Sequence, residues 1–188
     1  MKRGKPDLLN FAIQTARDAG RVLAEKFGRA LQVSSKGDID LVTEADIAAE
    51  QLIVERVRSY HPRHAVLAEE AGDVLAVGGA DSEYKWIIDP LDGTTNYAHG
   101  YPCFCVSVAL EHKGRVVLGV VHDPLRDETF AAERGAGASL NGRPARVEDP
   151  RVRRLAGRRL LGSLDQFSDS TDLVSDASWR AALRRLYD

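Results

Sequence analysis

The chain has 188 residues, of which 44% are hydrophobic and 29% are charged. This composition is typical of a globular domain and argues against a chain that is disordered along its whole length. Its 26 basic and 28 acidic side chains give a formal net charge of −2. A dedicated nucleic-acid binder is usually basic, so we do not expect nucleic acid as a partner.

The sequence also argues against a membrane or an oxidising compartment. No run approaches the ~18 consecutive apolar residues that a spanning helix needs. The N-terminus has neither the apolar run nor the cleavage site of a secretory signal. Cys103 and Cys105, which are the two cysteines, are too close in sequence for a disulfide to close a useful loop. We therefore expect reduced thiols and a cytoplasmic protein with no membrane partner.

Two amphipathic helices are predicted in the first third of the chain. Apolar residues recur at three- and four-residue spacing over residues 7–29, and again over residues 44–60. Thr43 is placed to cap the second helix, and Asp46 completes a shortened capping box. Residues 30–42 between the helices are polar and are expected to form an irregular loop.

Strands dominate the expected middle of the chain. Runs rich in β-branched and aromatic residues predict them at residues 65–68, 84–88, 104–110, 115–121 and 128–132. A Gly-rich loop is expected at residues 72–81, a hairpin around Gly114 and a tight turn at residues 140–143.

The chain changes character after about residue 150. An arginine-rich stretch is followed by one rich in serine and aspartate, and neither extends the preceding strand pattern. We therefore expect a folded unit at residues 1–150 and a divergent tail at residues 151–188.

The strongest chemical signal is the segment DPLDGTTN at residues 89–96. An apolar strand delivers Asp89, and Asp92 follows three residues later, where a turn can fold both carboxylates toward one point. Gly93 permits a close backbone approach, and Thr94 and Thr95 add hydroxyl and N–H groups where a helix could begin. Two carboxylates beside such donors are typical of a Mg²⁺–phosphate site.

Alternatives to a Mg²⁺–phosphate site stay open at this point. An Asp-Pro-x-Asp-Gly turn can simply cap a helix. The Asp-x-Asp arrangement of phosphatases that form an aspartyl-phosphate does not fit the spacing here, and the alternating acidic residues of an EF-hand are missing.

Two further acidic segments could contribute to the same site. Glu69 and Glu70 follow the apolar run at 65–68, and Glu69 could join Asp89 around one metal if the two strands are neighbours. The alternative is a solvated acidic turn. The segment from Asp40 to Asp46 leads from a loop into a helix, and simple helix capping explains it equally well.

Together these segments resemble the inositol monophosphatase family of Mg²⁺-dependent, lithium-sensitive phosphatases. The resemblance rests on DLVTEAD at 40–46, LAEEAG at 67–72, WIIDPLDGTTNYAHGYP at 86–102 and GVVHDP…RGAGASLNGRP at 119–144. It implies an α+β fold in which N-terminal helices pack on a largely antiparallel sheet, as part of an α-β-α-β-α layered architecture.

The resemblance also implies a role for each matching residue. The metal ligands would be Glu69, Asp89, the main-chain carbonyl of Leu91, and Asp92. The substrate-binding residues would be Glu69, Leu91, Asp92, Gly93, Thr94 and Thr95, of which the last three cradle the phosphate. Glu69 and Thr94 would position the attacking water, and Asp46 would be hydrogen-bonded to Thr94. Lys36 would lie near a further metal or the phosphate.

The implied reaction is Mg²⁺-dependent hydrolysis of a small phosphate monoester, with inositol 1-phosphate as the first expectation. Histidinol phosphate, fructose 1,6-bisphosphate and adenosine 3′,5′-bisphosphate are the rival substrates. Two cations would neutralise the phosphate and activate a water, so no protein nucleophile is required.

One family segment, Trp-Asp-x-Ala-Ala-Gly, has no counterpart in the sequence. Its aspartate would complete the second metal site, so we expect weak Mg²⁺ binding and low turnover from a truncated chain. A non-catalytic remnant or binding protein is the alternative to an enzyme. A homodimer is expected if the fold is complete.

Overall fold

The structure of the chain is a computed structural model that describes residues 7–28, 33–35, 41–68, 74–75 and 82–145. Within these residues an eight-stranded sheet has the order β10-β9-β8-β7-β6-β5-β3-β4, and a separate two-stranded sheet pairs β1 with β2. Among the described strands of the large sheet, all neighbours are antiparallel except β3 and β5, which run parallel.

The helices of the described residues are α1 (Leu8–Lys26), α2 (Glu44–Tyr60) and α3 (Thr94–Ala98). The strands before α3 are β1 (Val33–Ser35), β2 (Leu41–Thr43), β3 (Ala65–Ala68), β4 (Val74–Leu75) and β5 (Tyr84–Asp92). The strands after α3 are β6 (Cys105–His112), β7 (Arg115–Asp123), β8 (Glu128–Glu133), β9 (Gly137–Leu140) and β10 (Arg143–Ala145).

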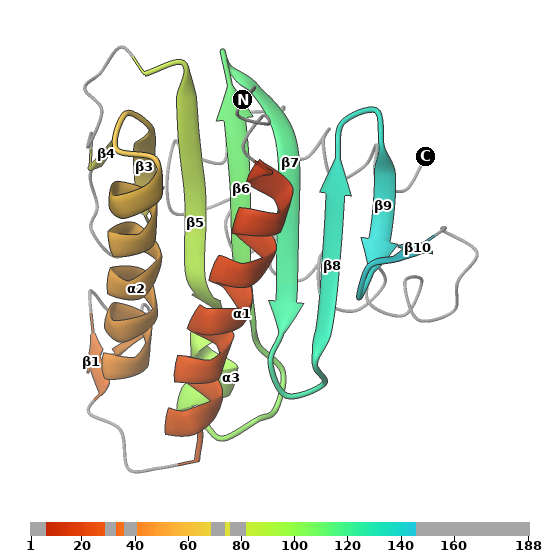
Figure 1. Cartoon of the computed structure of the whole chain (residues 1–188). Helices are drawn as coiled ribbons and strands as arrows, with labels where there is room; N and C mark the ends of the chain where they lie inside the picture. Colours follow the sequence, from red (N-terminus) through yellow and green to blue (C-terminus); the bar gives the residue numbers. More distant parts are fainter. Residues whose placement is uncertain (1–6, 29–32, 36–40, 69–73, 76–81, 146–188) are drawn as a thin grey trace.

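Both long helices lie side by side on the same face of the large sheet, where α1 packs on β6 and β7 and α2 packs on β5 and β3 (Figure 1). The short helix α3 follows β5 at one end of the sheet, beside the C-terminal half of α1. The core between helices and sheet is apolar and consists mainly of Ala12, Ala16, Ala19, Leu23, Ala49, Ile53, Val57, Trp86, Ile88, Val106, Val108, Leu110 and Val120. Small side chains on the helices permit their close approach to the larger residues of the strands.

The predicted helices are confirmed with small changes at their ends. α1 covers Leu8–Lys26 within the expected 7–29, and α2 has the expected bounds. The Thr43 side chain accepts from the N–H groups of Ala45 and Asp46, and the Asp46 side chain accepts from the Thr43 N–H, which together form the predicted capping box.

One strand prediction is wrong in a way that matters for the site. The run 84–88 was expected to stop before Asp89-Pro90, but β5 continues to Asp92. The strand continues past Pro90 because a β-bulge interrupts its pairing with β6 between Asp89 and Asp92. A bulge is one of the few places in a sheet that tolerates a residue without a backbone donor.

Several short strands were not expected from the sequence. β1 and β2 pair inside the segment predicted to be irregular, and β4 lies inside the predicted Gly-rich loop. β9 and β10 flank the tight turn at residues 140–143, where Asn141 and Gly142 both have positive φ, as a two-residue hairpin requires. Two- to four-residue strands carry too few side chains to show a periodicity of their own.

The predicted α+β class is confirmed for the described residues: two helices cover one face of a mixed, mainly antiparallel sheet. No helix in this part of the chain is long and apolar enough to cross a membrane. The tail at residues 151–188 lies outside the described residues.

A column of stacked rings lies at the end of the sheet opposite α3. It joins the C-terminus of α2 to the first residue of β5 and the last residue of β6. The His61 and His64 rings stack with centroids 4.8 Å apart, His64 stacks on Tyr84 at 4.7 Å, and Tyr84 stacks on His112 at 4.3 Å. Trp86 Nε1 donates to His64 Nδ1 over 3.1 Å, which requires an unprotonated Nδ1. Burial, assisted by the neighbouring His61, lowers the pKa of His64 to about 4, and burial also lowers the pKa of His61.

This column predicts that the protein loses stability in mild acid. In the unfolded chain His64 takes up a proton near pH 6.5, but in the folded chain it does so only near pH 4, so unfolding consumes protons between these values. We expect the free energy of unfolding to fall by about 1–2 kcal/mol between pH 7 and pH 5, a value reduced for the partial exposure of the ring. Urea titrations at both pH values measure it.

The His64→Gln variant should show a smaller fall, whereas His99→Gln, at an exposed position, should keep the fall of the wild type. A fall of the same size in the His64→Gln variant would contradict the assignment.

Candidate metal and phosphate site

The parallel pair β3–β5 brings the end of β3 to the same end of the sheet as Asp89. Ala68, the last residue of β3, pairs with Ile88, the residue before Asp89. Glu69 was expected to join Asp89 around one metal only if the strands before them are neighbours. β3 and β5 meet that condition, and as parallel strands they end on the same side of the sheet. Glu69 itself lies outside the described residues, as does Lys36.

The bulge in β5 places both aspartates of the motif on one face of the sheet. Asp89 pairs with Ser107, and Asp92 pairs with Cys105, so Pro90 and Leu91 together oppose the single residue between these partners. Ser107 and Cys105 are two residues apart on β6 and therefore share a face, and directly opposed residues share it with them. A regular strand would have turned side chains three residues apart to opposite faces.

Main-chain and side-chain hydrogen bonds shape the turn after the bulge. Asp89 Oδ1 accepts from the Leu91 N–H over 3.1 Å. Thr94 Oγ1 lies 3.0 Å from the Leu91 carbonyl oxygen and 3.2 Å from Asp46 Oδ1, and its single proton can serve either acceptor. The structure thus brings Asp46 and Thr94 together in the contact that the family resemblance implies; their roles in catalysis stay predictions.

Asp46 is almost completely buried, at 1% exposure. Burial raises the pKa of its carboxyl group, and hydrogen bonds from the Thr43 hydroxyl, the Thr43 N–H and the Thr94 hydroxyl oppose that rise. One oxygen of Asp46 accepts from the Thr43 N–H at 2.9 Å, while the other faces Thr94. Asp46 therefore links the N-terminus of α2, where it completes the capping box, to the Thr94 hydroxyl at the start of α3.

Helix α3 is held against α1 by residues that the sequence analysis did not single out. The buried Tyr97 hydroxyl donates to the Leu23 carbonyl over 2.7 Å, and its ring packs against Phe27 and Phe104. Burial, with the carboxylates of Asp46 and Glu44, raises the pKa of Tyr97 to about 12. A tyrosine one residue past a polar motif carries no sequence signal for this anchoring role.

The described donors suit a hard cation, since Asp89 and Asp92 offer carboxylate oxygens and Leu91 offers a carbonyl oxygen. Among the described residues, no group of three or more His, Cys, Asp or Glu side chains could hold a metal ion. The predicted set includes one more carboxylate, that of Glu69. At the start of α3 the Thr94 side chain is half-buried and that of Thr95 is exposed, beside the backbone N–H groups that a first helical turn leaves unpaired.

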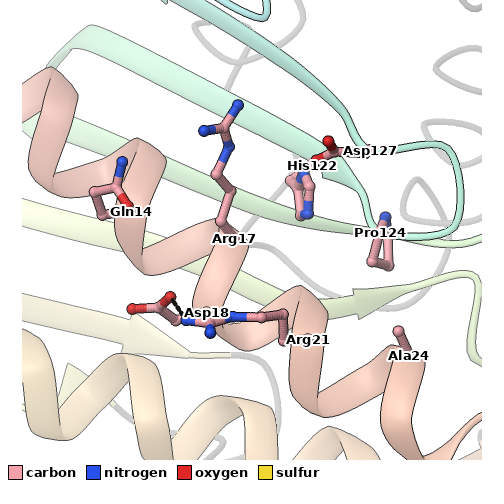
Figure 2. A pocket seen from close by; sticks show the side chains of 8 residues that line it. All are labelled: Gln14, Arg17, Asp18, Arg21, Ala24, His122, Pro124 and Asp127. Atoms are coloured by element: carbon pink, nitrogen blue, oxygen red, sulfur yellow. Dashed lines mark hydrogen bonds and ion pairs between the residues drawn. The ribbon is translucent and has the colours of Figure 1, made fainter.

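A separate pocket of about 290 Å³ lies between α1 and the turn from β7 to β8, and none of the predicted site residues is among its lining residues. Its lining is Gln14, Arg17, Asp18, Arg21, Ala24, His122, Pro124 and Asp127 (Figure 2). Arg21 pairs with Asp18, which also pairs with Arg56, and Arg17 donates through Nε to Thr129. Two arginines and two aspartates balance one another, so the pocket offers no net charge to a ligand.

Known proteins similar to this chain were found by sequence and by structure. The profile of the inositol monophosphatase family matches residues 5–183. An inositol-1-monophosphatase of Mesorhizobium japonicum is 49% identical over 142 residues, which are 74% of this chain and 52% of that protein. A Nus factor SuhB of Pasteurella multocida is 47% identical over 146 residues, 77% of this chain and 54% of that protein.

A solved structure shows the same arrangement of elements. The extragenic suppressor protein suhB of Bartonella henselae superposes with a TM-score of 0.71 at 44% identity, and the match covers 77% of this chain and 55% of that one. The chain thus spans about half the length of the curated relatives it matches. The family profile runs beyond residue 150, where we expected a divergent tail to begin, and the boundary placed there stays a prediction.

Gly93 provides a test of the turn that connects β5 to α3. Its φ is +99°, and a Cβ added there would lie 2.9 Å from the Cys103 carbonyl oxygen. Gly100 also has a positive φ, of +70°, but nothing lies within 4 Å of its Cβ position. We expect Gly100→Ala to cost about 1 kcal/mol of stability, from backbone strain alone, and Gly93→Ala to cost about 2–4 kcal/mol, since overpacking adds to it.

Thermal or urea unfolding of both variants measures this difference. Equal losses would show that the close approach of Gly93 to the Cys103 carbonyl does not constrain the turn.

Proposed function

Because the chain belongs to the inositol monophosphatase family, we propose that it carries the metal- and phosphate-binding part of a Mg²⁺-dependent phosphatase that acts on small phosphate monoesters. The observation that supports the proposal most is the β3–β5 register together with the bulge in β5. These two features gather the carboxylates of Asp89 and Asp92, and the strand end before Glu69, at one edge of the sheet.

The residues of this edge have distinct tasks in the proposed reaction. Asp89, Asp92, the Leu91 carbonyl and Glu69 hold Mg²⁺, which, when bound, offsets the phosphate charge and lowers the pKa of a bound water. The N–H groups after Gly93 hold phosphate oxygens at the start of α3.

Thr94 orients the attacking water. When its hydroxyl donates to Asp46, its lone pairs point away from that carboxylate and can accept a hydrogen bond from a water molecule. Since Asp46 is fixed by the capping box of α2, this acceptor keeps its place beside the Thr94 hydroxyl. Positioning of this kind supplies much of the rate enhancement in phosphoryl transfer.

Inositol 1-phosphate is the proposed substrate, in line with the name of the Mesorhizobium japonicum relative. Histidinol phosphate, fructose 1,6-bisphosphate and adenosine 3′,5′-bisphosphate are the competing monoesters. The motif at residues 89–96 would bind the metal and the phosphate group. All four compounds carry that group, so the motif does not choose among them.

A second candidate is a non-catalytic binding protein. Several similar proteins bear the name Nus factor SuhB, and the chain spans about half of their length. Under this proposal the same edge would still bind Mg²⁺ but would release no phosphate.

The Asp89→Asn variant separates these proposals from a purely structural turn. We expect the wild-type chain to bind Mg²⁺ in a calorimetric titration and to release phosphate from inositol 1-phosphate only when Mg²⁺ is present. Asp89→Asn should bind Mg²⁺ at least about tenfold more weakly, because it removes a charged ligand, and should lose the release of phosphate. Asp127→Asn, at an exposed position outside the predicted ligand set, is the matched control and should behave like the wild type.

The outcomes have different meanings. Mg²⁺ binding that depends on Asp89 without phosphate release from any of the four monoesters supports the non-catalytic candidate. A wild-type chain that binds no Mg²⁺, or an Asp89→Asn variant that binds it unchanged, overturns the metal site.

A further inference from the structure

Cys105 lies directly opposite Asp92 across the β5–β6 pair. Without the bulge, continuation of the Asp89–Ser107 register would set Asp92 opposite Phe104. The extra residue in β5 therefore brings the thiol and the carboxylate into one cross-strand pair, where side chains on the same face contact each other. Nothing in the sequence spacing of these two residues shows that they are partners.

The contact between them is a hydrogen bond. Cys105 Sγ donates to Asp92 Oδ2 over 3.5 Å, and both side chains are partly buried. A thiol is a weak donor, but a bond to an ionised acceptor is stronger than one between neutral groups. Because the bond engages one particular oxygen of the carboxylate, it selects one orientation of the Asp92 side chain.

We propose that Cys105 is a positioning residue, whose S–H bond to Oδ2 orients the Asp92 carboxylate toward the metal. The inference rests on the proposed function, since it assigns to Asp92 the role of a ligand. Groups that hold metal ligands through hydrogen bonds typically change metal affinity 10–100-fold when they are removed. A sulfur donor should fall at the lower end of that range.

The second cysteine supplies a matched control. Cys103 is two residues away and, like Cys105, partly buried and outside any disulfide, but its printed bond is made by the backbone: its carbonyl accepts from Asn96 Nδ2 over 2.9 Å. Its substitution by serine retains that carbonyl and leaves Asp92 untouched. An effect confined to position 105 would therefore separate the proposed bond from a general effect of removing thiols.

The test is a calorimetric Mg²⁺ titration of four proteins, with thermal melting in the absence of Mg²⁺. Cys105→Val removes the S–H donor and adds one methyl group at a partly buried position, so we expect it to bind Mg²⁺ about tenfold more weakly while its melting temperature stays within about 2 °C of the wild type. Cys105→Ser keeps a donor and should stay within about threefold of the wild type. Cys103→Ser should match the wild type.

Each contrary result identifies which proposal fails. If the wild type binds Mg²⁺ and Cys105→Val binds it equally well, or if Cys105→Ser weakens binding as much as Cys105→Val, the positioning role is overturned and the metal site stands. If the wild type binds no Mg²⁺, the proposed function fails and the positioning role fails with it. If Cys105→Val melts well below the wild type, Cys105→Ala, which also removes the S–H donor, takes its place in the same affinity comparison.

Discussion

The β-bulge in β5 is the constraint on which the rest of the site depends. Side chains three residues apart on a regular strand point to opposite faces of the sheet, so Asp89 and Asp92 could not act on one ligand. By setting Pro90 and Leu91 against a single residue of β6, the chain returns Asp92 to the face of Asp89. The proline favours the bulge because it cannot donate to the ladder, and the bulge in turn lets the strand run on to the start of α3.

Hydrogen bonds connect the two long helices to α3, at the end of the sheet where β5 stops. Asp46 closes the capping box of α2 with one oxygen and reaches Thr94 with the other, and Tyr97 anchors α3 on the carbonyl of Leu23 in α1. The Tyr97 bond is buried and the Thr94–Asp46 bond is partly buried, and leaving a buried polar group unpaired is costly. The position of the α3 N-terminus relative to the strand end is thus set by two helices rather than by the turn alone.

Local signals in the sequence explain which parts were predicted. The 3.6-residue periodicity and the Thr43 cap identified α2 with its observed bounds, since both depend on residues within one turn of each other. The same reasoning missed β1, β2 and β4, whose pairing comes from partners outside their own short segments. It also ended β5 at Asp89, because a proline ordinarily stops a strand and a bulge shows only when the partner strand is known.

By itself, the sequence determined the chemical character of the site: carboxylates at strand ends, a glycine where the backbone must take positive φ, and hydroxyls at a helix start. These properties belong to single residues and to their immediate neighbours, so a linear motif records them. Only the tertiary structure decided that β3 lies parallel to β5 and that Cys105 faces Asp92. Such pairings join residues far apart along the chain or across a bulge, and strand register is chosen by the packing of a whole sheet face against its helices.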